Sequence, residues 1–218
     1  MFLKKFKPDI VFLQEIDMYT KRAYNKNQIY TLSKYIELPY KSVGTNIKYK
    51  NGYYGDGILT KFPIEYSANY LSPLTNPSHE QRGILCNKIS FGNTKINVFS
   101  LHLSTHEKER ILSAKELLKI ISKLNKNEPI IIGGDFNVGI ENLGKHIYKY
   151  TYKDSFEEFE LLKQKLNHLE NNQPTWFSGD EKGCIDTFFY SKNLKLLSYK
   201  TIPCDISDHY AVYAEFLI

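Results

Sequence analysis

The sequence predicts an α/β sandwich built mainly from antiparallel strands. Strand-like apolar segments come in clusters and do not alternate one by one with helices, which favours a sandwich over a doubly wound sheet. Aromatic residues make up 14% of the 218 residues, and aromatic rings pack well on pleated surfaces. A chain of this length fits one domain with a substantial core, so we expect residues 1–218 to form a single domain.

The first half of the chain is predicted to form strands around one helix. The apolar run Asp9–Glu15 predicts a buried strand, and Asn25–Leu38, followed by Pro39, predicts a helix. Further strands are predicted at Asp56–Phe62, Gly83–Ile89 and Lys95–Leu103.

The second half contains the clearest helix of the sequence. Ser104 and Glu107 match a capping box, and apolar residues from Ile111 to Leu124 follow at helical spacing. We interpret the Lys- and Glu-rich face of this helix as solvated. Other predicted elements are a buried strand with a glycine turn at Pro129–Gly134, a helix at Ser155–Leu169, and strands at Cys184–Tyr190, Lys195–Pro203 and His209–Leu217.

Composition indicates a soluble protein with reduced thiols. The three cysteines are odd in number, far apart and form no CxxC motif, so we expect a cytoplasmic location. We expect no signal peptide and no transmembrane segment, because no apolar run has the necessary length. The formal net charge of +5 is compatible with a phosphate-bearing partner, although we see no dense basic stripe.

Oxygen-bearing side chains follow or open several of the predicted strands. They are Glu15, Asp135, Asn137, Asp186 and Asp208. Such a set at strand ends suits a hard cation, with Mg²⁺ expected and Mn²⁺ as an alternative. His102 adds a nitrogen within an apolar strand.

These residue types suit the hydrolysis of a phosphate ester. His209 has an intrinsic pKa range that allows it to act as a general base on water. Asp186 would fix its tautomer, and a metal on Glu15 and Asp208 would neutralise charge on the phosphoryl oxygens. The water and the phosphate would be positioned by Asp135, Asn137 and His102.

Simpler interpretations exist for each residue. Asp135 and Asn137 are common turn formers, and from the chemistry of the segment alone the turn would be preferred. His102 fits a satisfied core histidine, and Arg82 fits an ordinary surface arginine. The remaining histidines match no motif and are expected in surface or loop positions: His79, His106, His146 and His168.

The order of the motifs resembles the endonuclease/exonuclease/phosphatase superfamily across nearly the whole chain. The matching segments are Gln14-Glu15, Tyr54–Pro63, Gln81-Arg82-Gly83, Ser100–Leu103, Gly134–Asn137, Ile185-Asp186 and Ser207-Asp208-His209. The resemblance implies a four-layer α/β sandwich, in which two packed, mostly antiparallel sheets are flanked by helices, together with bound Mg²⁺ and phosphoester hydrolysis.

The resemblance also assigns roles to individual residues. It implies that Glu15 is a metal ligand with Asp208 close to the metal, and that His209 is the catalytic histidine oriented by Asp186. It implies that Asp135 and Asn137 position the nucleophile and the phosphate, that His102 contacts the phosphate, and that Arg82 approaches it.

One part of the family pattern is missing from the sequence. The family normally begins with an internal strand ending in a Trp-Asn-like pair, and no such strand precedes Asp9–Glu15. We therefore expect an N-terminally short domain with exposed sheet edges and weakened metal binding. A non-catalytic binding module is the alternative from another class.

For the substrate we expect nucleic acid. The segments HLSTHEKER and TWFSG look most like the tyrosyl-DNA phosphodiesterase and general phosphodiesterase branch, and the positive charge agrees with a nucleic acid. An inositol phosphate or a phospholipid headgroup stays open as an alternative.

Overall fold

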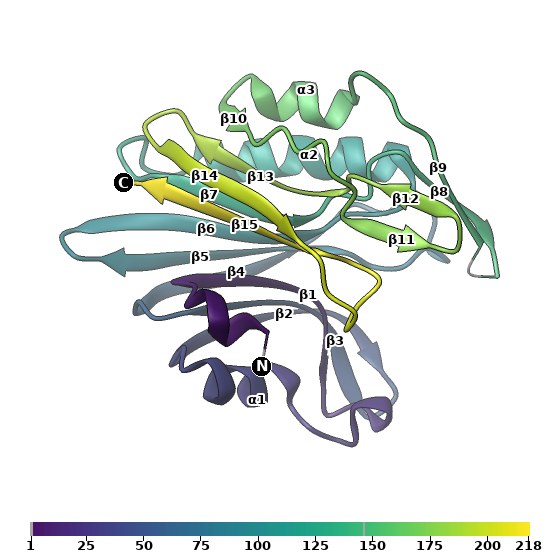
Figure 1. Cartoon of the computed structure of the whole chain (residues 1–218), viewed down its shortest axis with the longest axis horizontal. Coiled ribbons are helices and arrows are strands. Elements are labelled where there is room, and N and C mark those ends of the chain that lie inside the picture. Colours follow the sequence, from purple (N-terminus) through teal and green to yellow (C-terminus); the bar gives the residue numbers. More distant parts are fainter. Residues whose placement is uncertain (1, 146) are drawn as a thin grey trace. The chain divides into compact units, whose positions relative to one another are not determined.

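The computed structural model describes residues 2–145 and 147–218 (Figure 1). By its internal contacts the chain divides into two compact units, residues 1–102 (unit 1) and 103–218 (unit 2). Each unit is described by itself, and the expectation of a single domain stays a prediction.

Unit 1 contains two antiparallel sheets that pack on each other. One sheet has the strand order β1-β3-β2, and β4, β5 and β6 follow as a meander. The elements are η1 (Leu3–Phe6), β1 (Ile10–Met18), η2 (Lys21–Ala23), α1 (Gln28–Ile36), β2 (Tyr40–Tyr49), β3 (Gly52–Thr60), β4 (Ile64–Leu71), β5 (Gly83–Phe91) and β6 (Thr94–His102).

The sheet of β1, β2 and β3 is covered on one side by α1, which buries Ile29 and Ile36 against Val11 and Leu59. The helix begins at the cap Asn27, whose side chain accepts a hydrogen bond from the Tyr30 amide. It ends in the left-handed residue Glu37. The predicted helix Asn25–Leu38 is therefore confirmed, with bounds two to three residues shorter at each end.

In its described residues, 103–145 and 147–218, unit 2 contains a small antiparallel sheet, three two-stranded ribbons and two helices. In the sheet β13 lies between β10 and β7. The ribbons pair β8 with β9, β11 with β12 and β14 with β15. The elements are α2 (Glu107–Ser122), β7 (Ile130–Asp135), β8 (Ile140–Gly144), β9 (Ile147–Tyr150), α3 (Glu157–Lys163), β10 (Leu166–His168), β11 (Trp176–Ser178), β12 (Glu181–Gly183), β13 (Asp186–Ser191), β14 (Lys195–Ile202) and β15 (Ala211–Leu217).

A cluster of aromatic rings forms the core beneath α3. Phe136, Phe159 and Phe189 lie with ring centroids 5.1–5.5 Å apart, and His168 stacks on Phe189 at 4.5 Å. The expectation that His168 is a surface or loop residue is wrong, because its ring fills a place in this core. His146 lies outside the described residues.

The start of α2 differs from the predicted capping box. The helix begins at Glu107 with His106 as its cap residue. The Ser104 hydroxyl accepts from the His106 amide and donates to the Glu109 carboxylate instead.

The Lys- and Glu-rich face of α2 is not wholly solvated. Glu109 and Arg110 are 1% and 2% exposed, and Arg110 Nε donates to Glu158 on α3 at 2.6 Å. Arg110 can be buried because its charge is paired with that of Glu158, which lies 48 positions away in the sequence.

The segment Ser155–Leu169 is only partly helical. Its helix α3 ends at Lys163, and Leu166–His168 form the edge strand β10. In the described parts of the chain, no helix is both long enough and apolar enough to cross a membrane.

Candidate active site

Strand pairing in unit 2 brings two predicted site carboxylates together. β7 and β13 are antiparallel, and their register places Asp135, the last residue of β7, opposite Asp186, the first residue of β13. Gly134 precedes Asp135 with a φ of 152°, a conformation that favours glycine. Both side chains therefore lie at the same end of the sheet.

A sharp turn after β7 positions Asn137. Its φ of 49° is left-handed, which asparagine tolerates better than most residues. Asp135 Oδ1 accepts from the Asn137 amide at 2.8 Å, and Asn137 Nδ2 donates to the Leu103 carbonyl at 2.9 Å. The predicted turn is thus real, and both side chains hold it in place.

His209 reaches the same end of the sheet. Its Nδ1 lies 2.8 Å from Asp186 Oδ2, and its Nε2 lies 4.0 Å from Asp135 Oδ2. A carboxylate only accepts hydrogen bonds, so Nδ1 carries the proton toward Asp186. Nε2 then remains as the nitrogen that can exchange a proton with a reactant. We call Asp135, Asn137, Asp186 and His209 the His209 cluster.

Thr175 positions the two segments that carry Asp186 and His209, and the sequence prediction missed it. Its Oγ1 accepts from the amides of Ile185 and Asp186 at 3.1 and 3.0 Å. Its carbonyl accepts from the Tyr210 amide. Thr175 is fully buried, and nothing in the sequence distinguishes it from an ordinary loop threonine.

The carboxylates around His209 control its proton affinity. Burial lowers the pKa of His209. The hydrogen bond to Asp186 and the negative charges of Asp186, Asp135 and Asp208 raise it by a larger amount, so the resulting pKa is about 9, above the usual 6.5. Asp208 itself is exposed, and its carbonyl accepts from the Phe177 amide. With no added positive charge such as a metal ion, the His209 imidazole is therefore mostly protonated at neutral pH.

Unit 1 holds the other predicted site residues. Glu15 lies in a bulge of β1, where Gln14 and Glu15 together face one residue of β3. Its φ of 58° is left-handed, a strained conformation that is often found at functional sites. The Glu15 carboxylate is hydrogen-bonded to Tyr54, and the pKa of Tyr54 is raised by burial first and then by the Glu15 charge.

Arg82 and His102 form a second pair in unit 1. Gly83 is paired with His102 between β5 and β6, which brings Arg82 Nη1 within 2.8 Å of His102 Nδ1. Arginine only donates, so Nδ1 accepts and the neutral ring carries its proton on Nε2. Arg82 also contacts Glu80 at 3.0 Å. An arginine that is 11% exposed is not the ordinary surface residue of the alternative interpretation.

The predicted metal ligands fit Mg²⁺ by donor type. Glu15 and Asp208 are exposed carboxylates, and Mg²⁺ usually binds one or two carboxylates together with water and substrate phosphate. Among residues 2–145 and 147–218, no group of three or more His, Cys, Asp or Glu side chains is placed to hold a metal. The assignment of these two residues to Mg²⁺ stays a prediction.

Comparison with known proteins agrees with this chemistry. A model of the endonuclease/exonuclease/phosphatase family matches residues 1–209. The Escherichia coli (strain K12) protein YbhP is 30% identical over 96 residues, which cover 43% of this chain and 37% of YbhP. The chain therefore matches well under half of that relative.

Solved structures of low sequence identity share the fold. A family protein from Leptotrichia buccalis has a TM-score of 0.74 at 18% identity, covering 99% of this chain and 90% of the other. TDP2 from D. rerio, solved in complex with a single strand DNA product, has a TM-score of 0.73 at 19% identity, covering 100% and 89%. The predicted fold class, an α/β sandwich, is confirmed: the chain has a mixed α/β fold with several packed sheets and few helices.

Proposed function

Because the chain belongs to the endonuclease/exonuclease/phosphatase family, a family of phosphoesterases, we propose that it hydrolyses phosphodiester bonds of nucleic acid with Mg²⁺. The observation that carries the proposal is the His209 cluster. A histidine is held by one carboxylate on Nδ1 while its Nε2 faces a second carboxylate 4.0 Å away. That arrangement suits proton transfer to and from a reacting water.

His209 is proposed as the general base on water. The Asp186 carboxylate fixes the tautomer and stabilises the imidazolium that forms. With a pKa of about 9, His209 is mostly protonated at neutral pH, so its function as a base requires a lower pKa during turnover. Bound Mg²⁺ would supply positive charge that lowers this pKa and neutralises the phosphoryl oxygens.

The other residues of the two units receive supporting roles. Asn137 and Asp135 are proposed to position the water and the phosphate, since their turn holds them at the end of β7. The His102 ring, with its proton on Nε2, is proposed to donate to a phosphoryl oxygen, and Arg82 is proposed to hold His102 in that tautomer. Glu15 and Asp208 are the proposed metal ligands.

Nucleic acid is favoured over the other phosphate esters by two observations. The formal charge is +5, which favours a polyanionic partner. One similar structure, TDP2, was solved with a single strand DNA product.

The proposal is tested by hydrolysis of bis-p-nitrophenyl phosphate and of a short DNA strand, with Mg²⁺ or EDTA. We expect turnover only with Mg²⁺, and a loss of about 10³-fold or more in His209→Ala. His79→Gln, which changes a histidine outside every motif, is the matched control and should keep its activity. Equal rates from the wild type and His209→Ala would refute the enzyme and favour a binding module.

A further inference from the structure

The positive charge of the chain is concentrated in one stretch of unit 1. Residues 19–54 contain seven Lys and Arg residues and a single acid, Glu37, whereas the rest of the chain contains 22 basic and 23 acidic residues. Glu37 is itself paired with Lys4. The same stretch contains eight of the 17 tyrosines. The sequence shows no dense basic stripe here because these residues are spread over a helix, a loop and a hairpin.

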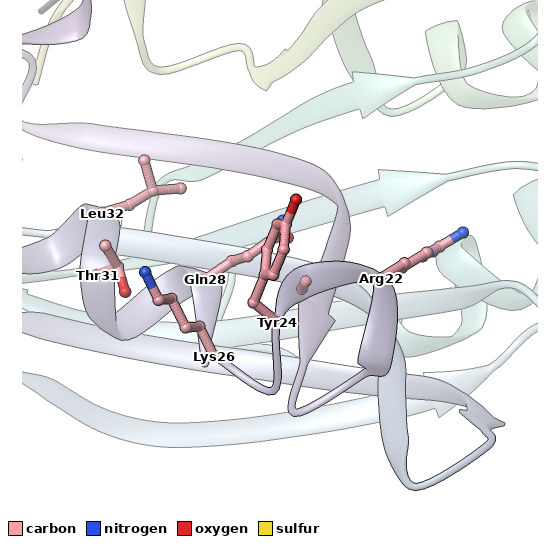
Figure 2. A pocket seen from close by; sticks show the side chains of 7 residues that line it. Arg22, Tyr24, Lys26, Gln28, Thr31 and Leu32 are labelled. Atoms are coloured by element: carbon pink, nitrogen blue, oxygen red, sulfur yellow. The ribbon is translucent and has the colours of Figure 1, made fainter.

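The centre of this stretch is a hollow of about 420 Å³ between η2 and α1. Figure 2 shows Tyr24 and Lys26 projecting from the segment between η2 and α1, with Arg22 at one end of the view and Leu32 at the other. Tyr24 is 84% exposed, so its ring is accessible to a ligand. The lining residues are Arg22, Ala23, Tyr24, Lys26, Gln28, Thr31 and Leu32.

Arg22 connects this hollow to further aromatic rings. Its guanidinium carbon lies 4.9 Å from the Tyr49 ring centroid and 4.8 Å from that of Tyr54, and its Nε donates to Asp17 at 2.7 Å. Such contacts fix the guanidinium plane in place. Lys50 lies over the same Tyr49 ring at 5.4 Å.

Tyr54 continues this path to the predicted metal ligand. Its hydroxyl is hydrogen-bonded to Glu15, so contacts lead from Arg22, which lines the hollow beside Tyr24, over Tyr54 to Glu15 within unit 1. We call Arg22, Tyr24, Lys26, Tyr49 and Lys50 the Tyr24 surface.

The side chains of the Tyr24 surface fit a single-stranded nucleic acid better than a duplex or a membrane. Alternating rings and cations match the alternating bases and phosphates of a single strand, whose bases are free to stack. In a duplex the bases already stack on one another, so an exposed ring adds little. A membrane surface is a poorer match, because the large exposed hydrophobic residues of this stretch are all tyrosines, and membrane-bound surfaces usually insert Trp, Phe or Leu.

We propose that the Tyr24 surface binds single-stranded nucleic acid, with a base stacked on Tyr24 and backbone phosphates on Lys26 and Arg22. The strand then runs over Tyr49 toward Glu15. That the bound strand is also a substrate rests on the proposed function, because the strand would be hydrolysed near Glu15. Binding itself does not depend on hydrolysis.

The test measures binding alone, in the His209→Ala chain, by fluorescence anisotropy of a labelled twelve-nucleotide oligo(dT) strand. We expect Tyr24→Ala to weaken binding about tenfold, the size typical for the loss of one base–aromatic stack, and Tyr24→Phe to keep it. Lys26→Glu should weaken binding and flatten its salt dependence. Tyr66→Ala, which removes another exposed tyrosine ring, on β4 and outside the Tyr24 surface, is the matched control.

A matching twelve-base-pair duplex should show less than a twofold change with Tyr24→Ala. Equal losses for the duplex and the single strand, or equal losses in Tyr24→Ala and Tyr66→Ala, would overturn the proposed stacking. Binding to phosphatidylserine vesicles that depends on Tyr24, with no binding of the oligonucleotide, would overturn it in favour of a membrane surface. Inactivity of the wild type with intact Tyr24-dependent binding would refute the proposed hydrolysis and leave the surface standing.

Discussion

His168 makes the stability of unit 2 depend on pH. Its ring stacks on Phe189 and lies 4.7 Å from the Phe159 centroid. The Thr187 hydroxyl donates to the Leu169 carbonyl at 2.7 Å, so it accepts from His168 Nε2 at 3.2 Å. A second proton would have to go on Nδ1, which is buried and has no hydrogen-bond partner among the described residues.

The size of the effect follows from the pKa. Burial above all, helped by the charge of Lys163, lowers the pKa of His168 from 6.5 to about 4. Below pH 6.5 the unfolded chain takes up a proton that the folded chain refuses until about pH 4, so stability is lost as the pH falls through this window. At pH 5 this costs roughly 2 kcal/mol, because each pKa unit corresponds to about 1.4 kcal/mol. Such a loss is large beside a typical total of about 5–15 kcal/mol.

The measurement is urea unfolding at pH 7.5 and at pH 5.0, comparing the wild type with His168→Phe. Trp176 is the only tryptophan of the chain and is buried in unit 2, so its fluorescence reports on the unit that contains His168. Phenylalanine keeps a ring in the stack but does not titrate. The wild type should lose about 2 kcal/mol more than His168→Phe between the two pH values. The same pH dependence in both proteins would show that His168 is not held neutral by its surroundings.

Three further changes test other contacts. Arg110→Met should destabilise unit 2 by about 3–5 kcal/mol because Glu158 is left buried without its partner, and Arg110→Met/Glu158→Leu should recover most of this in urea unfolding. Asp186→Asn should reduce kcat/KM for bis-p-nitrophenyl phosphate by about 10³–10⁴-fold. It should also lower the pKa of His209 in an NMR titration. An unchanged pKa of His209 would show that Asp186 is not its hydrogen-bond partner. Glu15→Gln should raise the Mg²⁺ concentration for half-maximal activity about tenfold or more, whereas an identical metal titration would exclude Glu15 as a ligand.

The sequence located the strands of the site but not their register. Apolar runs predict that Asp135 follows one strand and that Asp186 lies in another. That the two face each other depends on the antiparallel pairing of β7 with β13, which joins residues 51 positions apart. A shift of one residue would turn Asp186 to the other face of the sheet. Long-range register of this kind leaves no local signal in a single sequence.

Charged and titratable residues in the core were the main errors, for a common reason. Arg110 and Glu109 look like members of a solvated helix face, and His168 looks like a loop histidine. Arg110 and His168 are buried because a distant residue supplies a hydrogen bond that water would otherwise supply: Glu158 for Arg110 and Thr187 for His168. Glu109 accepts a hydrogen bond from Ser104, five positions before it. Local composition cannot distinguish a charge that has such a partner from one that has none.

For Asp135 and Asn137 the sequence offered two interpretations, a glycine turn or a catalytic site, and the structure shows that they are compatible. Asp135 uses Oδ1 to close the turn on the Asn137 amide, and its Oδ2 is the oxygen that faces His209 Nε2. The turn therefore fixes the rotamer that presents Oδ2, in the same way that supporting hydrogen bonds fix ligands around a reacting centre. Asp135→Asn would keep an oxygen for the turn while removing the charge that faces His209. Reduced turnover with unchanged stability in that variant would separate the two functions of one side chain.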